Sequence, residues 1–254
     1  MNSHNLFLST IDANAAEIAG KYGFGLEIAE YCTAMNMDET DGKFHSQVLR
    51  QIQGVKHLVF HGPFSELFPC AIDPKARQLA MKRFTQASRL AQSFGIHKVV
   101  FHGGFVPNVY YPCWYVEQSI CFWKDFLKDQ PEDMIFCVEN VMEQDPAWMR
   151  DIARGVEDPR LRLCLDVGHA NVCSSIPVEQ WLDTLAPWLA HFHIHNNDGS
   201  ADTHSPLCSG KIPIASLLCR AQELCPDASF TLEVLHGEQD VSWLLEQGIL
   251  EEEQ

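Results

Sequence analysis

Apolar and β-branched residues recur along the chain in eight short runs, and most of these runs are followed by a longer stretch with helical periodicity. Short apolar runs bounded by turn residues are typical of strands that are buried on both faces, as in parallel sheets. The pattern predicts strands at approximately 5–9, 24–30, 55–61, 98–102, 134–139, 161–166, 189–195 and 229–234, with bounds uncertain by about two to four residues.

The clearest helix is predicted to follow His61. Asp73 is suited to be its N-cap and Pro74 its first residue. Its apolar positions recur at spacings of three and four residues, as expected of a face packed on a sheet: Ala80, Phe84, Ala87, Ala91 and Phe94. Further helical stretches are 12–21, 43–53, 114–128, 146–154, 178–186, 213–224 and 240–247.

Eight strands alternating with helices predict an α/β fold, a single-domain (β/α)8 TIM barrel over residues 1–254. The phosphate-binding glycine patterns GxxxxGK and GxGxxG are absent from the sequence, so an open nucleotide-binding sheet lacks its fingerprint. The pair Gly103-Gly104 after His102 is interpreted as a tight turn.

Composition narrows the class of partner. The 18 basic and 34 acidic residues give a net charge of −16, which disfavours nucleic acid and favours a small-molecule substrate. No apolar stretch approaches the roughly 20 residues of a membrane span, and no leader precedes the first strand, so a soluble cytoplasmic protein is expected. The ten cysteines include no CxxC pair and are expected to be mostly buried free thiols. The oligomeric state stays open.

Nine potential metal ligands fall where a barrel would gather them. Six lie at the ends of predicted strands, and three follow within a few residues in the next loop. The carboxyl ends of all parallel strands in a barrel lie on the same face, so these side chains are predicted to surround one pocket there. They are His61, His102, Glu139, Asp166, His169, His195, Asp202, His204 and Glu233.

Four of the nine end the last four predicted strands in succession: Glu139, Asp166, His195 and Glu233. Adjacent strand ends are about 5 Å apart, so these side chains can converge on one ion. Three carboxylates and an imidazole suit Mn²⁺, Mg²⁺, Co²⁺ or Zn²⁺. His193 shares the parity of His195 deeper in the barrel, which makes it the next candidate as a ligand or as a partner behind the ligands.

The other five extend the site around the rim. His169 is predicted to lie in the loop after Asp166, and Asp202 and His204 in the connection after the seventh strand. His61 and His102 complete the third and fourth strand positions, either as further ligands or as substrate-orienting residues.

At these residues the chain resembles the xylose-isomerase-like barrels, which comprise sugar phosphate isomerases and epimerases and the endonuclease IV family. The matching segments cover most of the chain: His61-Gly-Pro-Phe64, Phe101-His102-Gly-Gly, Val138-Glu139-Asn140, Cys164-Leu-Asp166-Val-Gly-His169-Ala-Asn171, His193-Ile-His195-Asn-Asn-Asp198-Gly, Asp202-Thr-His204-Ser-Pro-Leu and Thr231-Leu-Glu233-Val.

The resemblance implies one of two ligand sets. The four strand-end ligands are similar to the single-metal set of the isomerases and epimerases, whereas all nine match the three-metal set of the endonuclease IV type. Phe64, where the DNA repair enzymes show Tyr, and the scarcity of basic residues favour the sugar branch. The segment Cys208-Ser-Gly-Lys-Ile-Pro213 departs from the Gly-rich version of both branches, so the shape of that rim loop stays open.

Three hypotheses follow. In the first, a divalent ion stabilises an enediolate of a small keto sugar, sugar phosphate or related polyol, Glu139 and Glu233 move the proton, and His61, His102 and His169 bind substrate. In the second, up to three zinc ions hydrolyse a phosphodiester at abasic DNA. In the third, the barrel binds a ligand without catalysis, which fits a pocket rich in metal ligands least well.

Overall fold

The structure is a computed structural model that describes residues 1–39 and 42–250. Its eight parallel strands close into a barrel in sequence order, with β1 hydrogen-bonded to both β2 and β8. The strands are β1 (Leu6–Ser9), β2 (Gly25–Ile28), β3 (Leu58–His61), β4 (Lys98–His102), β5 (Ile135–Glu139), β6 (Leu161–Asp166), β7 (Leu189–Ile194) and β8 (Ser229–Leu232). The predicted TIM barrel is confirmed.

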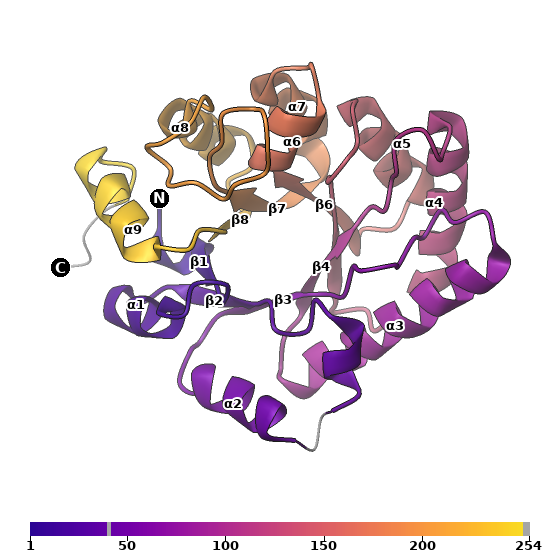
Figure 1. Ribbon diagram of the computed structural model, residues 1–254, viewed down its shortest axis with the longest axis horizontal. Helices are drawn as coiled ribbons and strands as arrows, with labels where there is room; N and C mark the ends of the chain where they lie inside the picture. Colours follow the sequence, from indigo (N-terminus) through magenta and orange to yellow (C-terminus); the bar gives the residue numbers. More distant parts are fainter. Residues whose placement is uncertain (40–41, 251–254) are drawn as a thin grey trace.

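Helices surround the ring of strands on all sides (Figure 1). Short 3₁₀ turns at Ser3–Asn5, Ala34–Met37 and Ala186–Trp188 connect some elements. The α-helices of the described residues are α1 (Ala15–Tyr22), α2 (Lys43–Gln51), α3 (Pro74–Ser93), α4 (Pro112–Leu127), α5 (Pro146–Val156), α6 (Val167–Cys173), α7 (Val178–Leu185), α8 (Ile214–Leu224) and α9 (Gly237–Glu246).

All eight predicted strands and all eight predicted helices are present, with ends within about three residues of the predicted bounds. The start of α3 matches in detail, because the Asp73 carboxylate accepts a hydrogen bond from the Lys75 amide and Pro74 is the first helical residue. Most of the predicted apolar stripe of α3 is buried, with Phe84 stacked on Phe101 of β4 at a centroid distance of 4.1 Å.

One helix was not predicted. The segment after Asp166 was expected to be a loop, but it forms α6, so His169 lies on a helix rather than in a loop. Asp166 is both the last residue of β6 and the N-cap of α6, and its carboxylate accepts a hydrogen bond from the His169 amide at 2.6 Å. A helix of only seven residues shows too little periodicity to be recognised in the sequence.

The inside of the barrel holds two layers of different character. The lower layer is a small apolar cluster of Phe7, Val59, Val100, Cys137 and Cys164. Residues two positions further along the strands point the same way, and four of them are ionisable: His61, His102, Glu139 and Asp166. The larger apolar core lies between the outer strand faces and the helices.

The cysteine prediction was partly wrong. All ten cysteines are free thiols, as predicted, but only Cys70, Cys137, Cys164 and Cys225 are buried. Four others are exposed on helices or loops: Cys113, Cys121, Cys208 and Cys219. None of the helices among the described residues is both long and apolar enough to cross a membrane.

Candidate metal centre and active site

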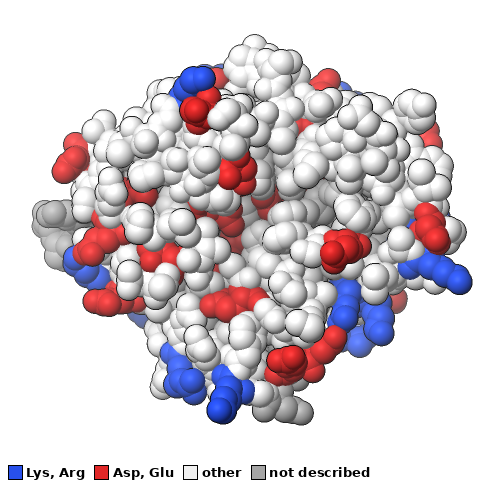
Figure 2. All heavy atoms as spheres, in the orientation of Figure 1, with Lys and Arg blue, Asp and Glu red and all other residues white. Residues whose placement is uncertain are grey.

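All nine predicted ligands lie together at the carboxyl ends of the barrel strands. Seven of them line a pocket of about 560 Å³, and Asp166 and His195 lie beneath it, fully buried. Figure 2 shows acidic side chains deep in the central hollow of this face, with Lys and Arg toward its edge. The pocket is lined by Ile11, Ala29, Cys32, His61, Phe64, His102, Glu139, His169, Asp202, Thr203, His204, Glu233 and Leu235.

A first donor cluster joins β3, β4 and β5. The Nε2 atoms of His61 and His102 each lie 3.5 Å from Oε2 of Glu139. Nδ1 of His61 lies 3.0 Å from the Gly62 carbonyl, so the ring donates its Nδ1 proton there and turns Nε2 toward Glu139. Oε2 of Glu139 is buried and has no hydrogen-bond partner.

A second cluster surrounds Asp202 at the rim. Nε2 of His169 lies 3.3 Å, and Nε2 of His204 3.2 Å, from Oδ2 of Asp202. Both rings have Nδ1 on a backbone carbonyl, that of Asn140 at 3.0 Å and that of Glu233 at 2.8 Å. The two histidines therefore aim the same type of nitrogen at one carboxylate, which is the usual arrangement of metal-binding imidazoles.

A third cluster lies at the floor of the pocket. His195 Nε2 is 3.2 Å from Oδ1 of Asp166. Nδ1 of His193 lies 3.3 Å from Oε1 of Glu139, 3.8 Å from Oδ2 of Asp166 and 3.7 Å from Oε2 of Glu233. Three carboxylates from β5, β6 and the end of β8 thus meet around a single ring nitrogen.

These spacings fit a divalent ion. Two ligands held about 2.1 Å from a tetrahedral zinc are about 3.4 Å apart, which is close to the separations in all three clusters. The unpartnered, buried Oε2 of Glu139 is the atom that most requires a cation. The clustered His, Glu and Asp side chains can therefore hold a metal ion.

The charge states of His102 and Glu139 suit ligand roles. Burial lowers the pKa of His102 to about 3, and the charge of Glu139 opposes this shift without reversing it, so His102 is neutral near pH 7. Burial would raise the pKa of Glu139, but the facing imidazoles, His193 first, hold it well below its usual range. A neutral imidazole beside an ionised carboxylate is the form that binds metals.

Comparison of nearly the whole chain with known proteins identifies its family. A family model described as a xylose isomerase-like TIM barrel matches residues 22–249. The chain belongs to this family. An uncharacterized protein of Methanocaldococcus jannaschii is 24% identical over 187 residues, which are 69% of this chain and 64% of that protein. The match therefore spans less than two thirds of the relative's length.

Solved structures share the fold of this xylose isomerase-like barrel. A Thermus thermophilus protein soaked with ZnCl2 has a TM-score of 0.79 and 24% identity, over 97% of this chain and 99% of that one. A D-tagatose 3-epimerase-like protein has a TM-score of 0.77 and 20% identity, over 96% and 97%. Endonuclease IV from Thermus thermophilus has a TM-score of 0.64 and 20% identity, over 95% and 96%.

Gly168 has no side chain, and this allows α6 to pack closely against the floor of the pocket. A Cβ atom at Gly168 would lie 1.9 Å from Cε1 of His195. We expect Gly168→Ala to displace the His195 ring, to weaken zinc binding at least about tenfold and to destabilise the fold by about 1–3 kcal/mol. Competition with a chromophoric chelator and thermal unfolding measure the two effects.

Gly20→Ala is the matched control, because Gly20 lies in α1 and a Cβ there meets nothing within 4 Å. It should leave zinc affinity unchanged and raise stability by about 0.5–1 kcal/mol. Wild-type zinc affinity in Gly168→Ala would show that His195 is not held by this contact or does not bind the ion.

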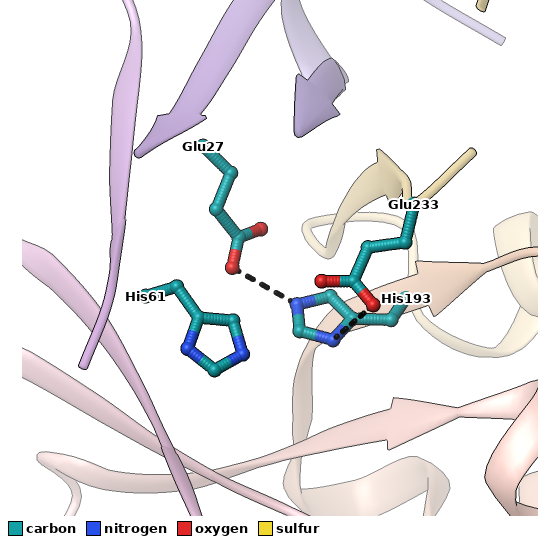
Figure 3. A group of neighbouring side chains, drawn as sticks. All are labelled: Glu27, His61, His193 and Glu233. Atoms are coloured by element: carbon teal, nitrogen blue, oxygen red, sulfur yellow. Dashed lines mark hydrogen bonds and ion pairs between the residues drawn. The ribbon is translucent and has the colours of Figure 1, made fainter. Parts of the chain in front are cut away.

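The sequence reasoning missed Glu27. This residue of β2 is fully buried, and its carboxylate oxygens lie 3.0 Å from Nε2 of His193 and 2.9 Å from Nε2 of His191. Figure 3 shows the side chain pointing into the barrel toward His193. A lone carboxylate inside the apolar run Gly-Leu-Glu-Ile-Ala was the available signal, since a buried acid requires a partner.

Proposed function

We propose that this protein is a divalent-metal-dependent isomerase or epimerase of a small keto sugar or related polyol. The observation that supports this most is the approach of Glu139 and Glu233 to the same point from β5 and from the end of β8, 3.3 and 3.7 Å from His193 Nδ1. Two carboxylates on different sides of one small pocket are suited to remove a proton and return it.

The proposed ion ligands are Glu139, Asp166, His195 and Glu233. When bound, the ion would supply Lewis acidity for the carbonyl and hydroxyl oxygens of the substrate. Glu139, ionised by its imidazole neighbours, would take the proton from the carbon beside the carbonyl, and Glu233 would deliver one to the product carbon. His61, His102 and His169 would orient the substrate hydroxyls.

The pocket lining favours an uncharged substrate. Among the described residues, no Lys or Arg lines it. Its apolar members include Ile11, Phe64 and Leu235, and Phe64 stacks on His102 at a centroid distance of 4.2 Å. Without a fixed cation, an anionic phosphate would depend on the metal ion for its binding.

The second cluster favours one rival function, phosphodiester hydrolysis at a three-ion centre as in the endonuclease IV branch. His169, Asp202 and His204 are not needed by a single-ion isomerase, yet their donor atoms converge. The acidic surface around the pocket opposes DNA as the substrate.

Metal content separates the two functions. Protein purified without chelator is expected to carry about one Mn, Mg, Co or Zn ion per chain, because one complete ligand set suffices for proton transfer; elemental analysis measures it. Three zinc ions per chain, together with chelator-sensitive cleavage of an abasic duplex, would support the hydrolase instead. A protein that retains no divalent ion from any supplied salt would contradict both functions.

Activity is tested by solvent deuterium exchange. Keto sugars with and without a phosphate are incubated with the loaded enzyme in D2O, and NMR follows the carbon beside the carbonyl. An isomerase or epimerase exchanges that hydrogen and loses the exchange on chelation. The absence of exchange from the whole panel would count against the sugar assignment.

A further inference from the structure

The ring of His193 lies between Glu27 and three other buried carboxylates. On one side Nε2 lies 3.0 Å from Oε1 of Glu27, and on the other side Nδ1 faces Glu139, Asp166 and Glu233. Figure 3 shows the contacts with Glu27 and Glu233. The His193 side chain is fully buried. Its contacts with these carboxylates are therefore shielded from water.

Glu27 is fixed in place by further partners. Its second oxygen, Oε2, accepts hydrogen bonds from the Thr231 hydroxyl and from Nε2 of His191 at 2.9 Å. Nδ1 of His191 in turn lies 2.6 Å from the Ser229 hydroxyl. Both oxygens of Glu27 are thus engaged, which leaves this carboxylate to orient His193 rather than to bind an ion itself.

The hydrogen bond to Glu27 fixes the tautomer of His193. An ionised carboxylate can only accept, so Nε2 of His193 must carry the proton. Nδ1 faces three carboxylates and has no hydrogen-bond partner. Three buried carboxylates that converge on one point are unfavourable without a positive charge between them, and an ion bound to Nδ1 would supply that charge.

We propose that Nδ1 of His193 is an additional ligand of the divalent ion and that Glu27 is its positioning residue. The donor atoms of His193, Glu139 and Asp166 lie within 4.8 Å of one another, which suits a shared ion. A histidine that binds metal through one nitrogen and donates the other N–H to a carboxylate is a common arrangement. This inference rests on the metal requirement of the proposed function.

The rival reading is an imidazolium. A His193 ring protonated on both nitrogens would bridge Glu27 and the three carboxylates with no ion at that point. The two readings differ in what Glu27 does for metal binding. If His193 is a ligand, loss of the Glu27 charge weakens the site; if it is an imidazolium, Glu27 has no direct role in binding the ion.

The first test is Glu27→Gln, with zinc affinity measured by chelator competition. We expect a loss of about 10–100-fold, together with a changed visible spectrum of the Co²⁺-loaded protein, which reports the donor set. Ser229→Ala is the matched control, because it removes the far partner of His191 and leaves the contact between Glu27 and His193 in place. It should bind zinc within about twofold of wild type. Unchanged zinc affinity and Co²⁺ spectrum in Glu27→Gln would overturn the inference.

A measurement on the wild-type chain does not depend on how the variant folds. A crystal structure with zinc, with the ion located by anomalous scattering, is expected to place an ion about 2.1 Å from Nδ1 of His193. An ion on Glu139, Asp166 and Glu233 but beyond about 3 Å from that nitrogen would refute the His193 assignment and leave the proposed function standing. A crystal with no ion at any of these carboxylates would refute both.

Discussion

Glu139→Gln is expected to reduce turnover of the identified substrate about 1,000-fold or more. The substitution removes a base that would act in proton transfer, a contribution of about 10²–10⁴-fold, and it also removes the charge shared by the first and third donor clusters. Glu139 contacts His61 and His102 through one oxygen and His169 and His193 through the other. Steady-state kinetics at saturating metal separates the loss of chemistry from the loss of the ion.

Glu233→Gln should show a comparable loss, since the proposed reaction uses one carboxylate to take the proton and the other to return it. Asp198→Asn is the control from the same face of the barrel, because the Asp198 carboxylate is exposed and bonds Ser200 rather than any of the proposed ligands. It should retain wild-type turnover. If either glutamate variant kept full activity, the two-base assignment would be wrong.

Removal of divalent ions is expected to lower the melting temperature by roughly 8–16 °C. Free zinc at about 1,000 times its dissociation constant stabilises the folded state by about 4 kcal/mol, and one kcal/mol corresponds to about 2–4 °C in a domain of this size. The physical reason is the set of buried carboxylates that face one another across the pocket floor. Thermal unfolding with saturating zinc and with chelator measures the difference.

The difference between the melting temperatures with zinc and with chelator should increase as the pH rises. Burial opposes protonation of His204, but its hydrogen bond to Asp202 and the charge of Glu233 raise its pKa to about 9. In the ion-free protein this stabilisation is complete below about pH 6.5 and is lost as the pH rises through 9. His204 lies 3.8 Å from the carboxylate of Glu233, a proposed ligand, so its positive charge opposes the cation and ion binding improves as the ring loses its proton. Equal melting temperatures with zinc and chelator from pH 6.5 to 9 would contradict the metal assignment.

The fold could be predicted because parallel strands of a barrel are buried on both faces. The strand runs before His102 and Glu139 contain almost only apolar residues, which separates them clearly from the amphipathic helices between them. The meeting of the nine side chains followed from the common direction of the strand ends, which is a property of the barrel itself.

The rest of the site depends on tertiary contacts, which cannot be predicted from the spacing of residues in the sequence. The position of His169 depends on α6, which begins only because Asp166 caps it and because Gly168 leaves space for His195. The role of Glu27 depends on β7 lying across the barrel from β2, 164 and 166 positions away from His191 and His193. A buried acid signals that a partner exists but does not say which one.

A chain of hydrogen bonds runs through the inside of the barrel from His193 through Glu27 and His191 to Ser229. Ser229 also accepts a hydrogen bond from Lys98. These polar side chains fill the space where many barrels carry aliphatic ones. Burying so many ionisable groups stabilises a protein less than hydrocarbon of the same volume would. A homologue without the proposed activity would be free to exchange these residues for valine, leucine and isoleucine, and should then tolerate heat better than this protein.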